Sequence, residues 1–189
     1  MPIKRVPVNI QNHILSEARQ VPSPNFNERP ETCEPELVVV HCISLPPGQF
    51  GGPFIEQFFQ NQLDPGGHPY FAEIAQMEVS SHLLIRRDGE IIQFVPFNRR
   101  AWHAGKSCYE GRENCNDFSI GIELEGVDDG PYEQIQYDRL KQVIECLAAH
   151  YPSITPRNVT GHSDIAPGRK TDPGPHFDWK KLEQMLGLS

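Results

Sequence analysis

Hydrophobic and polar positions follow two different periods along the chain, and these periods separate predicted strands from predicted helices. Residues 36–45 (ELVVVHCISL) include four consecutive apolar residues, which is typical of a strand covered on both faces. Residues 119–125 (SIGIELE) alternate strictly, so the isoleucines and the leucine face one way and the other residues face the opposite way. Residues 80–96 predict a hairpin, because Asp88 and Gly89 form a turn signal between two apolar runs.

Helical spacing of apolar residues appears in other segments. Residues 10–19 predict a short first helix. The next segment, residues 20–35, holds four prolines and predicts an irregular wrap over the surface. Pro53 is expected to open a second helix, and residues 131–151 predict the longest one, stopped by the next proline. Asp178 caps a short C-terminal helix. Because strands and helices interleave, the sequence predicts an α/β fold with a mixed sheet.

We expect a single domain over residues 1–189, with an N-terminal helix and wrap in residues 1–35 and a catalytic core in residues 36–189. The formal net charge of −8 argues against nucleic-acid binding, which depends on an excess of lysine and arginine. No apolar run approaches the roughly 20 residues that span a bilayer, and polar residues interrupt the N-terminal segment, so no signal peptide is predicted. We therefore expect no membrane partner. Separately, we expect the protein to be a monomer.

The five cysteines are odd in number and scattered, which fits free thiols in a reducing cytoplasm. Pairing of Cys108 with Cys115 under oxidising conditions is the alternative. The expected location is cytoplasmic.

Candidate chemistry gathers in residues 160–175 (TGHSDIAPGRKTDPGP), a Pro- and Gly-rich stretch that we expect to be neither helix nor strand. It carries His162, Lys170 and Asp172. A further candidate, His41, lies near the C-terminal end of a predicted strand, where active sites of α/β proteins gather.

Any one of these residues alone is more often structural than functional. Two histidines and an aspartate together match a catalytic zinc site, which usually takes three protein ligands and leaves one position open. His41, His162 and Asp172 are therefore candidate ligands for Zn²⁺, which acidifies bound water. Glu123, on the polar side of its strand, is the candidate proton shuttle, and Lys170 is the candidate partner for a developing oxyanion.

Four motifs resemble the zinc N-acetylmuramoyl-L-alanine amidases, and among them the cytoplasmic branch that acts on 1,6-anhydro-muropeptides. The similarity runs in order from about Leu15 to Trp179. The motifs are residues 40–48 (VHCISLPPG), 101–105 (AWHAG), 116–126 (NDFSIGIELEG) and 160–175.

The resemblance implies a central mixed sheet flanked by helices, shared with peptidoglycan-recognition proteins. It implies one zinc ion on His41, His162 and Asp172, with Glu123 as the catalytic glutamate and Lys170 as the loop lysine. The implied reaction cleaves the amide between the lactyl group of muramic acid and L-alanine of the stem peptide. The implied substrate is an anhydro-muropeptide recovered during cell-wall recycling.

Two positions depart from the pattern of the family, in which arginines often hold the carboxylates of the stem peptide. Here those positions are Glu78 and Asn114, and Arg112, Arg99 or Lys106 can substitute. The expected substrate contacts are Trp102, His103, Arg112 and Asn114.

Two other classes of protein stay open. The first is a peptidoglycan-binding module that does not cleave its ligand, in which the metal set is typically broken. The second is a thiol hydrolase that uses Cys42, which stands where the family often has asparagine, with His103 or His162. Cys42 is also a soft competing metal ligand beside His41.

Overall fold

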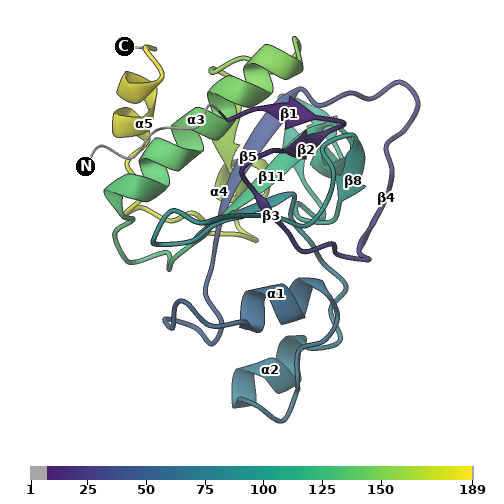
Figure 1. Ribbon diagram of the computed structural model, residues 1–189, viewed down its shortest axis with the longest axis vertical. Coiled ribbons are helices and arrows are strands. Elements are labelled where there is room, and N and C mark those ends of the chain that lie inside the picture. The colour runs from purple at the N-terminus through teal and green to yellow at the C-terminus, as the bar shows by residue number, and fades with distance from the viewer. Residues whose placement is uncertain (1–7, 189) are drawn as a thin grey trace.

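A six-stranded mixed sheet forms the centre of the computed structural model, which describes residues 8–188 (Figure 1). Its strands are β3 (Arg19–Gln20), β5 (Leu37–Ile43), β6 (Leu83–Ile85), β7 (Ile91–Gln93), β11 (Ser119–Glu125) and β12 (Val159–Gly161). They lie in the order β12-β5-β11-β6-β7-β3. β6 and β7 are antiparallel and the other neighbours are parallel, which confirms the predicted mixed sheet.

Both long predicted strands and the predicted hairpin are confirmed. The hairpin closes through a turn in which the N–H of Gly89 donates to the carbonyl of Arg86 at 2.9 Å. Gly89 has φ of +87°, a left-handed conformation that glycine adopts without strain. β12 was not predicted, because three residues are too short to show a period.

Helices cover the sheet and one of its ends. They are α1 (Phe54–Phe59), α2 (Pro69–Ile74), the 3₁₀ turn η1 (Cys115–Asp117), α3 (Gln134–His150), α4 (His162–Ile165) and α5 (Trp179–Met185). α3 begins later than the expected Pro131, because the side chain of Gln136 accepts a hydrogen bond from the N–H of Glu133 and fixes the start there. Asp178 caps α5 as predicted, accepting from the N–H of Lys181 at 2.9 Å.

The predicted N-terminal helix over residues 10–19 is wrong. That segment forms a small hairpin of β1 (Ile10–Gln11) and β2 (Ile14–Leu15). Asn12 and His13 have φ of +49° and +64°, so they form a left-handed two-residue turn that no helix contains. Two further short pairs join β4 (Phe26–Glu28) to β8 (Arg99–Ala101) and β9 (Cys108–Tyr109) to β10 (Arg112–Glu113).

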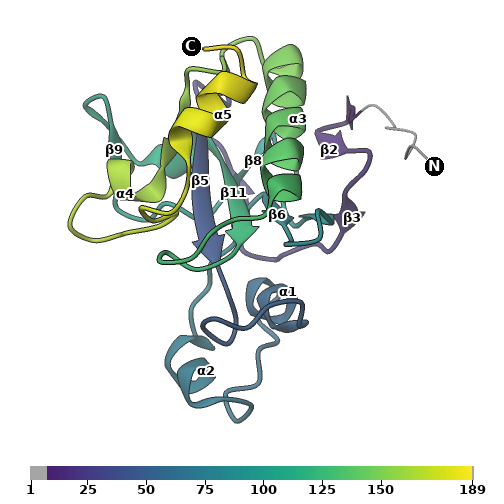
Figure 2. The same cartoon turned by 90° about the vertical axis from the view of Figure 1, so that its left-hand side faces the viewer.

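The two faces of the sheet bury different sets of residues. Val38 and Val40 of β5 pack with Ile120 and Ile122 of β11 in a core that α3 covers, and α5 lies beside α3 (Figure 2). The alternate residues of β5 pack on the opposite face, with Ile165 of α4. Side chains at odd positions of both strands therefore point away from α3.

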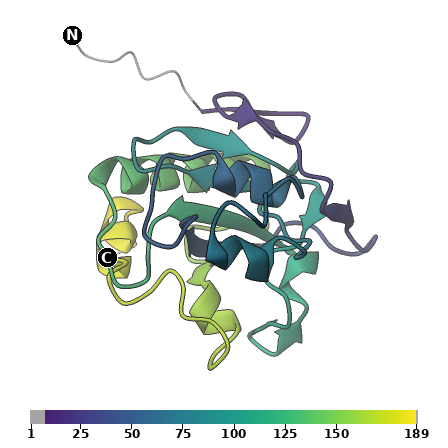
Figure 3. The ribbon, with the colours of Figure 1, turned by 90° about the horizontal axis from the view of Figure 1, so that it is seen from below.

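α1 and α2 lie beyond the carboxyl ends of β5 and β11 (Figures 1 and 2). Seen from below, they stand in front of the end of the sheet (Figure 3). α2 was not predicted; its N-terminus is marked by His68, whose ring accepts a hydrogen bond from the N–H of Tyr70 at 3.1 Å. Among the described residues, none of the helices has the length and apolar character that crossing a membrane requires.

Candidate metal centre

The register of three neighbouring strands brings the candidate site together. In the parallel pair of β11 and β5, Glu123 is the partner of His41. In the parallel pair of β12 and β5, Gly161 is the partner of Val40, so His162 follows β12 at the level of His41. All three side chains are therefore delivered to the carboxyl end of the sheet, where the loops diverge.

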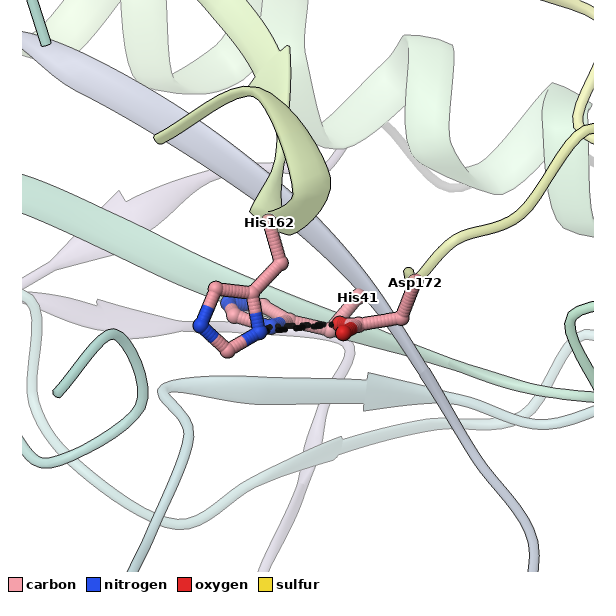
Figure 4. A group of neighbouring side chains, drawn as sticks. All are labelled: His41, His162 and Asp172. Carbon is pink, nitrogen blue, oxygen red and sulfur yellow. Dashed lines mark hydrogen bonds and ion pairs between the residues drawn. The ribbon is translucent and has the colours of Figure 1, made fainter. Parts of the chain in front are cut away.

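His41, His162 and Asp172 form a compact cluster whose polar atoms converge (Figure 4). Nδ1 of His41 lies 3.0 Å from Nδ1 of His162, and Oδ2 of Asp172 lies 3.0 and 3.1 Å from these two nitrogens. Tetrahedral zinc with bonds of about 2.0 to 2.1 Å separates its ligand atoms by about 3.3 Å. The two imidazoles and the carboxylate thus fit a divalent metal in both donor type and spacing.

The second nitrogen of each histidine is also engaged. Nε2 of His162 lies 3.1 Å from the carbonyl oxygen of Ala104, and Nε2 of His41 lies 2.9 Å from Nδ1 of His103. An engaged second nitrogen fixes the orientation and the tautomer of a ligating imidazole. The Nδ1 lone pairs are then free to face the centre of the cluster.

Burial and hydrogen bonds keep His41 and Asp172 in the protonation states that metal binding needs. Burial lowers the pKa of His41 to about 4, although its hydrogen bond to Asp172 acts in the opposite direction. For Asp172, burial acts to raise the pKa, but the hydrogen bonds to His162 and His41 outweigh it and the pKa lies well below its usual range. A neutral imidazole and an ionised carboxylate are the forms that bind metal.

Residues 160–175 are more regular than expected, because Thr160 and Gly161 belong to β12 and His162 begins α4. The rest of the stretch is held by its neighbours. The side chain of Thr171 donates to Asp128, and the hydroxyl of Tyr132 donates to the carbonyl of Pro173 at 2.7 Å. These contacts flank Asp172 and hold it against the end of β5.

Glu123 carries an unpartnered oxygen. The residue is 8% exposed, and its Oε2 has no hydrogen-bond partner among residues 8–188. Burial raises the pKa of Glu123 well above its usual value, and the charge of Asp172 adds to the effect, while Lys170 opposes it. A buried carboxyl group with a raised pKa is suited to general acid–base work.

A cavity of about 380 Å³ connects the cluster to solvent. His41, His162 and Asp172 line it together with Glu123 and the exposed Lys170. Its other wall is largely apolar and comes mainly from α1, α2 and the segments that follow them: Phe58, Phe59, Tyr70, Ile74, Met77 and Val79.

A larger cavity of about 530 Å³ lies elsewhere, beside Arg19, Arg86 and Glu125. Arg19 and Arg86 are tied into ion pairs with Glu56, Glu90 and Glu125. It contains none of the cluster residues.

Trp102 and His103, two of the expected substrate contacts, do line the cavity of the cluster. Trp102 is held by its indole N–H, which donates to Asn27 at 2.7 Å, and by its backbone N–H, which donates to Ser80 at 3.0 Å. The structure therefore brings both residues to the site, while the molecule they contact stays a prediction.

The other two expected substrate contacts do not reach this cavity. Arg112 forms an ion pair with Glu36 at 2.9 Å and covers the ring of Phe118, so its guanidinium is occupied elsewhere. Asn114 lines a separate pocket that also contains Lys106. Of the suggested substitutes, Arg99 is paired with Glu28.

Cys42 lines the cavity but is a poor nucleophile. Its thiol donates to Asp128 at 3.0 Å. Burial, with the contact to Asp128, raises the pKa of Cys42 well above its usual value, which disfavours the thiolate that nucleophilic attack needs. The structure therefore speaks against the thiol hydrolase.

Several residues of the site escaped the sequence analysis. Asp128 and Tyr132 hold the loop that carries Asp172, and Tyr70 and Met77 form part of the apolar wall. Nothing in their local sequence distinguishes them, because their roles come from contacts between distant segments.

Comparison with known proteins defines the class to which this site belongs. Residues 31–175 match the model of the family described as N-acetylmuramoyl-L-alanine amidase. The chain therefore belongs to this family of amide-hydrolysing enzymes, and the resemblance noted in the sequence is confirmed.

Individual relatives narrow the comparison. The chain is 58% identical to the 1,6-anhydro-N-acetylmuramyl-L-alanine amidase AmpD of Enterobacter cloacae, over 95% of this chain and 96% of that one. A crystal structure of AmpD superimposes with a TM-score of 0.91 at 57% identity, covering 93% of this chain and 98% of that chain. The amidase AmiD of E. coli, solved as a complex with anhydro-N-acetylmuramic acid-L-Ala-D-γ-Glu-L-Lys, matches with a TM-score of 0.58 at 29% identity, covering 95% of this chain and 65% of that chain.

Proposed function

We propose that the chain hydrolyses the amide between the lactyl group of 1,6-anhydro-N-acetylmuramic acid and L-alanine of the stem peptide, with Zn²⁺ as its cofactor. The observation that carries the proposal is the convergence of His41, His162 and Asp172 beside Glu123, whose buried Oε2 has no hydrogen-bond partner in the described part of the chain. The proposal includes a monomer acting as one catalytic domain in the cytoplasm during cell-wall recycling, as in the branch that the sequence resembles.

His41 and His162 would hold the metal through Nδ1, and Asp172 through Oδ2, because these are the atoms that converge. The carboxylate offsets one of the two positive charges, so the site keeps a net charge of about +1. When bound, zinc polarises the scissile carbonyl and makes a water molecule acidic enough to lose a proton near neutral pH.

Glu123 is the group that moves protons in this proposal. Its raised pKa and buried, unpartnered Oε2 allow it to take a proton from the attacking water. The same carboxyl then gives the proton to the nitrogen of L-alanine, which cannot leave as an anion. The carboxyl group of Glu123 can perform both proton transfers, because Glu123 lies beside His41 in the sheet.

Lys170 stabilises the negative charge that develops on the carbonyl oxygen. Lys170 lines the cavity from the same loop as Asp172. A cation close to the developing charge stabilises it, and the solvent that reaches the exposed Lys170 moderates the effect.

The apolar wall of the cavity supports the sugar half of the substrate. Trp102, Tyr70 and Met77 offer aromatic and flexible apolar surface opposite the charged cluster. A 1,6-anhydro-sugar has fewer hydroxyl groups than the corresponding non-anhydro sugar, so it suits an apolar surface. The substrate class is also supported by the anhydro-muropeptide bound to the relative AmiD.

A binding module without catalysis is the less favoured alternative, because the ligand set is complete and an acid–base group stands beside it. The experiment that separates the two is incubation of zinc-loaded protein with an anhydromuramyl tripeptide and with its non-anhydro counterpart, followed by mass spectrometry. We expect the anhydro compound to yield the free tripeptide and the anhydro-sugar. An uncleaved substrate that nevertheless binds would contradict the proposal and favour the module.

A further inference from the structure

His103 has no assigned role in the proposed reaction, yet it makes a direct contact with the candidate metal centre. Its Nδ1 lies 2.9 Å from Nε2 of His41, and the two rings meet edge to face with centroids 5.0 Å apart. Its other nitrogen, Nε2, lies 3.2 Å from the hydroxyl of Ser119 at the start of β11. His103 therefore joins β11 to the cluster through two successive hydrogen bonds.

The position of the ring is fixed on several sides. The side-chain oxygen of Asn116 accepts hydrogen bonds from the backbone N–H groups of His103 and Ala104, at 3.1 and 2.8 Å. The ring lies directly over Gly121 of β11, where an added Cβ would stand 2.5 Å from it. Only glycine at position 121 leaves room for this ring, so His103 packs directly on the backbone of β11.

A metal on His41 determines where the protons of His41 and His103 lie. A metal on Nδ1 of His41 requires the proton of that ring to sit on Nε2, and this N–H needs an acceptor. Nδ1 of His103 is the acceptor only if the proton of His103 sits on its own Nε2. The hydroxyl of Ser119 can donate or accept, so it can take that second N–H, and a metal on His41 thereby fixes the tautomers of both rings.

We propose that His103 is a positioning residue that orients His41 for metal binding, rather than a residue that contacts substrate. It does for His41 what the carbonyl of Ala104 does for His162. The inference rests on the proposed function in one respect, since it requires the cluster to bind a divalent metal.

A pair of variants at position 103 separates the acceptor from the space that the ring fills. Asparagine and leucine are closely similar in shape, but only the amide oxygen of His103→Asn can take the place of Nδ1 and accept from His41. We expect His103→Leu to weaken Zn²⁺ binding by about 10- to 100-fold, as loss of such partners does, and His103→Asn to restore most of it. The affinity is measured by competition with a chromogenic chelator.

The spectrum of Co²⁺-loaded protein gives a second readout that does not depend on activity. We expect His103→Leu to change the d–d bands, because His41 is no longer held in one orientation, and His103→Asn to keep them. Ser119→Ala removes only the outer hydrogen bond, and we expect a smaller loss of affinity with the same sign. Circular dichroism shows whether His103→Leu folds. If it does not fold, Ser119→Ala still tests whether the hydrogen bonds of His103 support metal binding.

The outcomes are distinct. Equal metal affinity in the wild type, His103→Leu and Ser119→Ala would overturn the positioning role while the proposed function stands. Equal loss in His103→Leu and His103→Asn would overturn it too, because packing would then explain the effect. A wild-type chain that binds no Zn²⁺ would overturn the proposed function and this inference with it.

Discussion

Nδ1 of His41 lies 3.0 Å from Nδ1 of His162, although the two residues are 121 positions apart in the chain. The parallel pairing of β12 with β5 accounts for this proximity, because it sets both histidines at the same level of the sheet. Two nitrogens and the carboxylate of Asp172 converge in a buried site, so the donor atoms are arranged by the fold itself. A metal site of defined geometry requires its ligand atoms to be held in place before the metal binds.

Removal of one ligand tests the metal centre. We expect His162→Ala and Asp172→Ala to lose bound zinc and at least about a thousandfold in kcat/KM, because the metal supplies several kcal/mol of transition-state stabilisation. Metal content by mass spectrometry and peptide release measure the two effects. His176→Ala changes an exposed histidine close to the same loop and serves as the control; an equal loss there would point to disruption of the loop instead.

Glu123→Gln tests the proton shuttle. The amide has nearly the same shape but cannot carry a proton, so we expect zinc to stay bound and kcat to fall by about 10²- to 10⁴-fold. Turnover and metal content are measured on the same sample. Near-normal turnover with zinc in place would remove Glu123 from the mechanism.

Lys170→Ala tests stabilisation of the oxyanion. Loss of one such group typically costs about 10²- to 10³-fold in kcat, and we expect a smaller change in KM, because the charge develops only in the transition state. Steady-state kinetics distinguish the two parameters. Lys180→Ala, an exposed lysine on α5, is the matched control and should behave as the wild type.

Arg86 tests the contribution of a buried ion pair to stability. It lies 3.0 Å from Glu125, which is 2% exposed. We expect Arg86→Met to lower the free energy of unfolding by about 3 to 5 kcal/mol, because it leaves that carboxylate buried without a cation. Lys141→Met breaks the exposed pair with Glu145 and should cost only about 0.3 to 0.5 kcal/mol. Urea denaturation measures both, and similar values for the two would contradict the assignment.

His82 makes stability depend on pH. Burial, with the nearby charge of Arg29, lowers the pKa of His82 to about 3. Between pH 6.5 and 3 the unfolded chain binds a proton there that the folded chain does not, so stability falls as the pH is lowered, by at most about 1.4 kcal/mol per pH unit.

The test compares urea midpoints at several pH values in the presence of chelator. We expect His82→Gln to reduce the slope, since glutamine has no proton to gain. His176→Gln, at an exposed position, should leave the slope unchanged. An unaltered slope in His82→Gln would show that other groups account for the acid sensitivity.

The sequence was sufficient where a long period or a long motif exists. β5 and β11 were predicted because seven residues in each show a clear pattern. For residues 10–19 the sequence wrongly predicts a helix, because Ile10, Ile14 and Ala18 happen to have helical spacing. Asn12 and His13, between the two short strands, have left-handed backbone conformations that exclude a helix. The pattern of apolar residues gives no information about these conformations.

The same contrast applies to the site. His41, His162 and Asp172 were predicted as a group from their residue types and are brought together by the fold. Arg112 does not line the cavity of this site, and its local sequence gives no sign of the ion pair that it forms with Glu36. The contact of His103 with His41 likewise depends on the sheet, because only the paired strands set the two rings side by side.

Titration of metal-free protein with Zn²⁺ tests the central claim most directly, with release of stem peptide from an anhydro-muropeptide as the readout. The metal-free chain should be inactive, and activity should rise linearly until one zinc ion per chain and then stay constant. Cleavage by the metal-free chain, or no cleavage at one bound zinc per chain, would contradict the account.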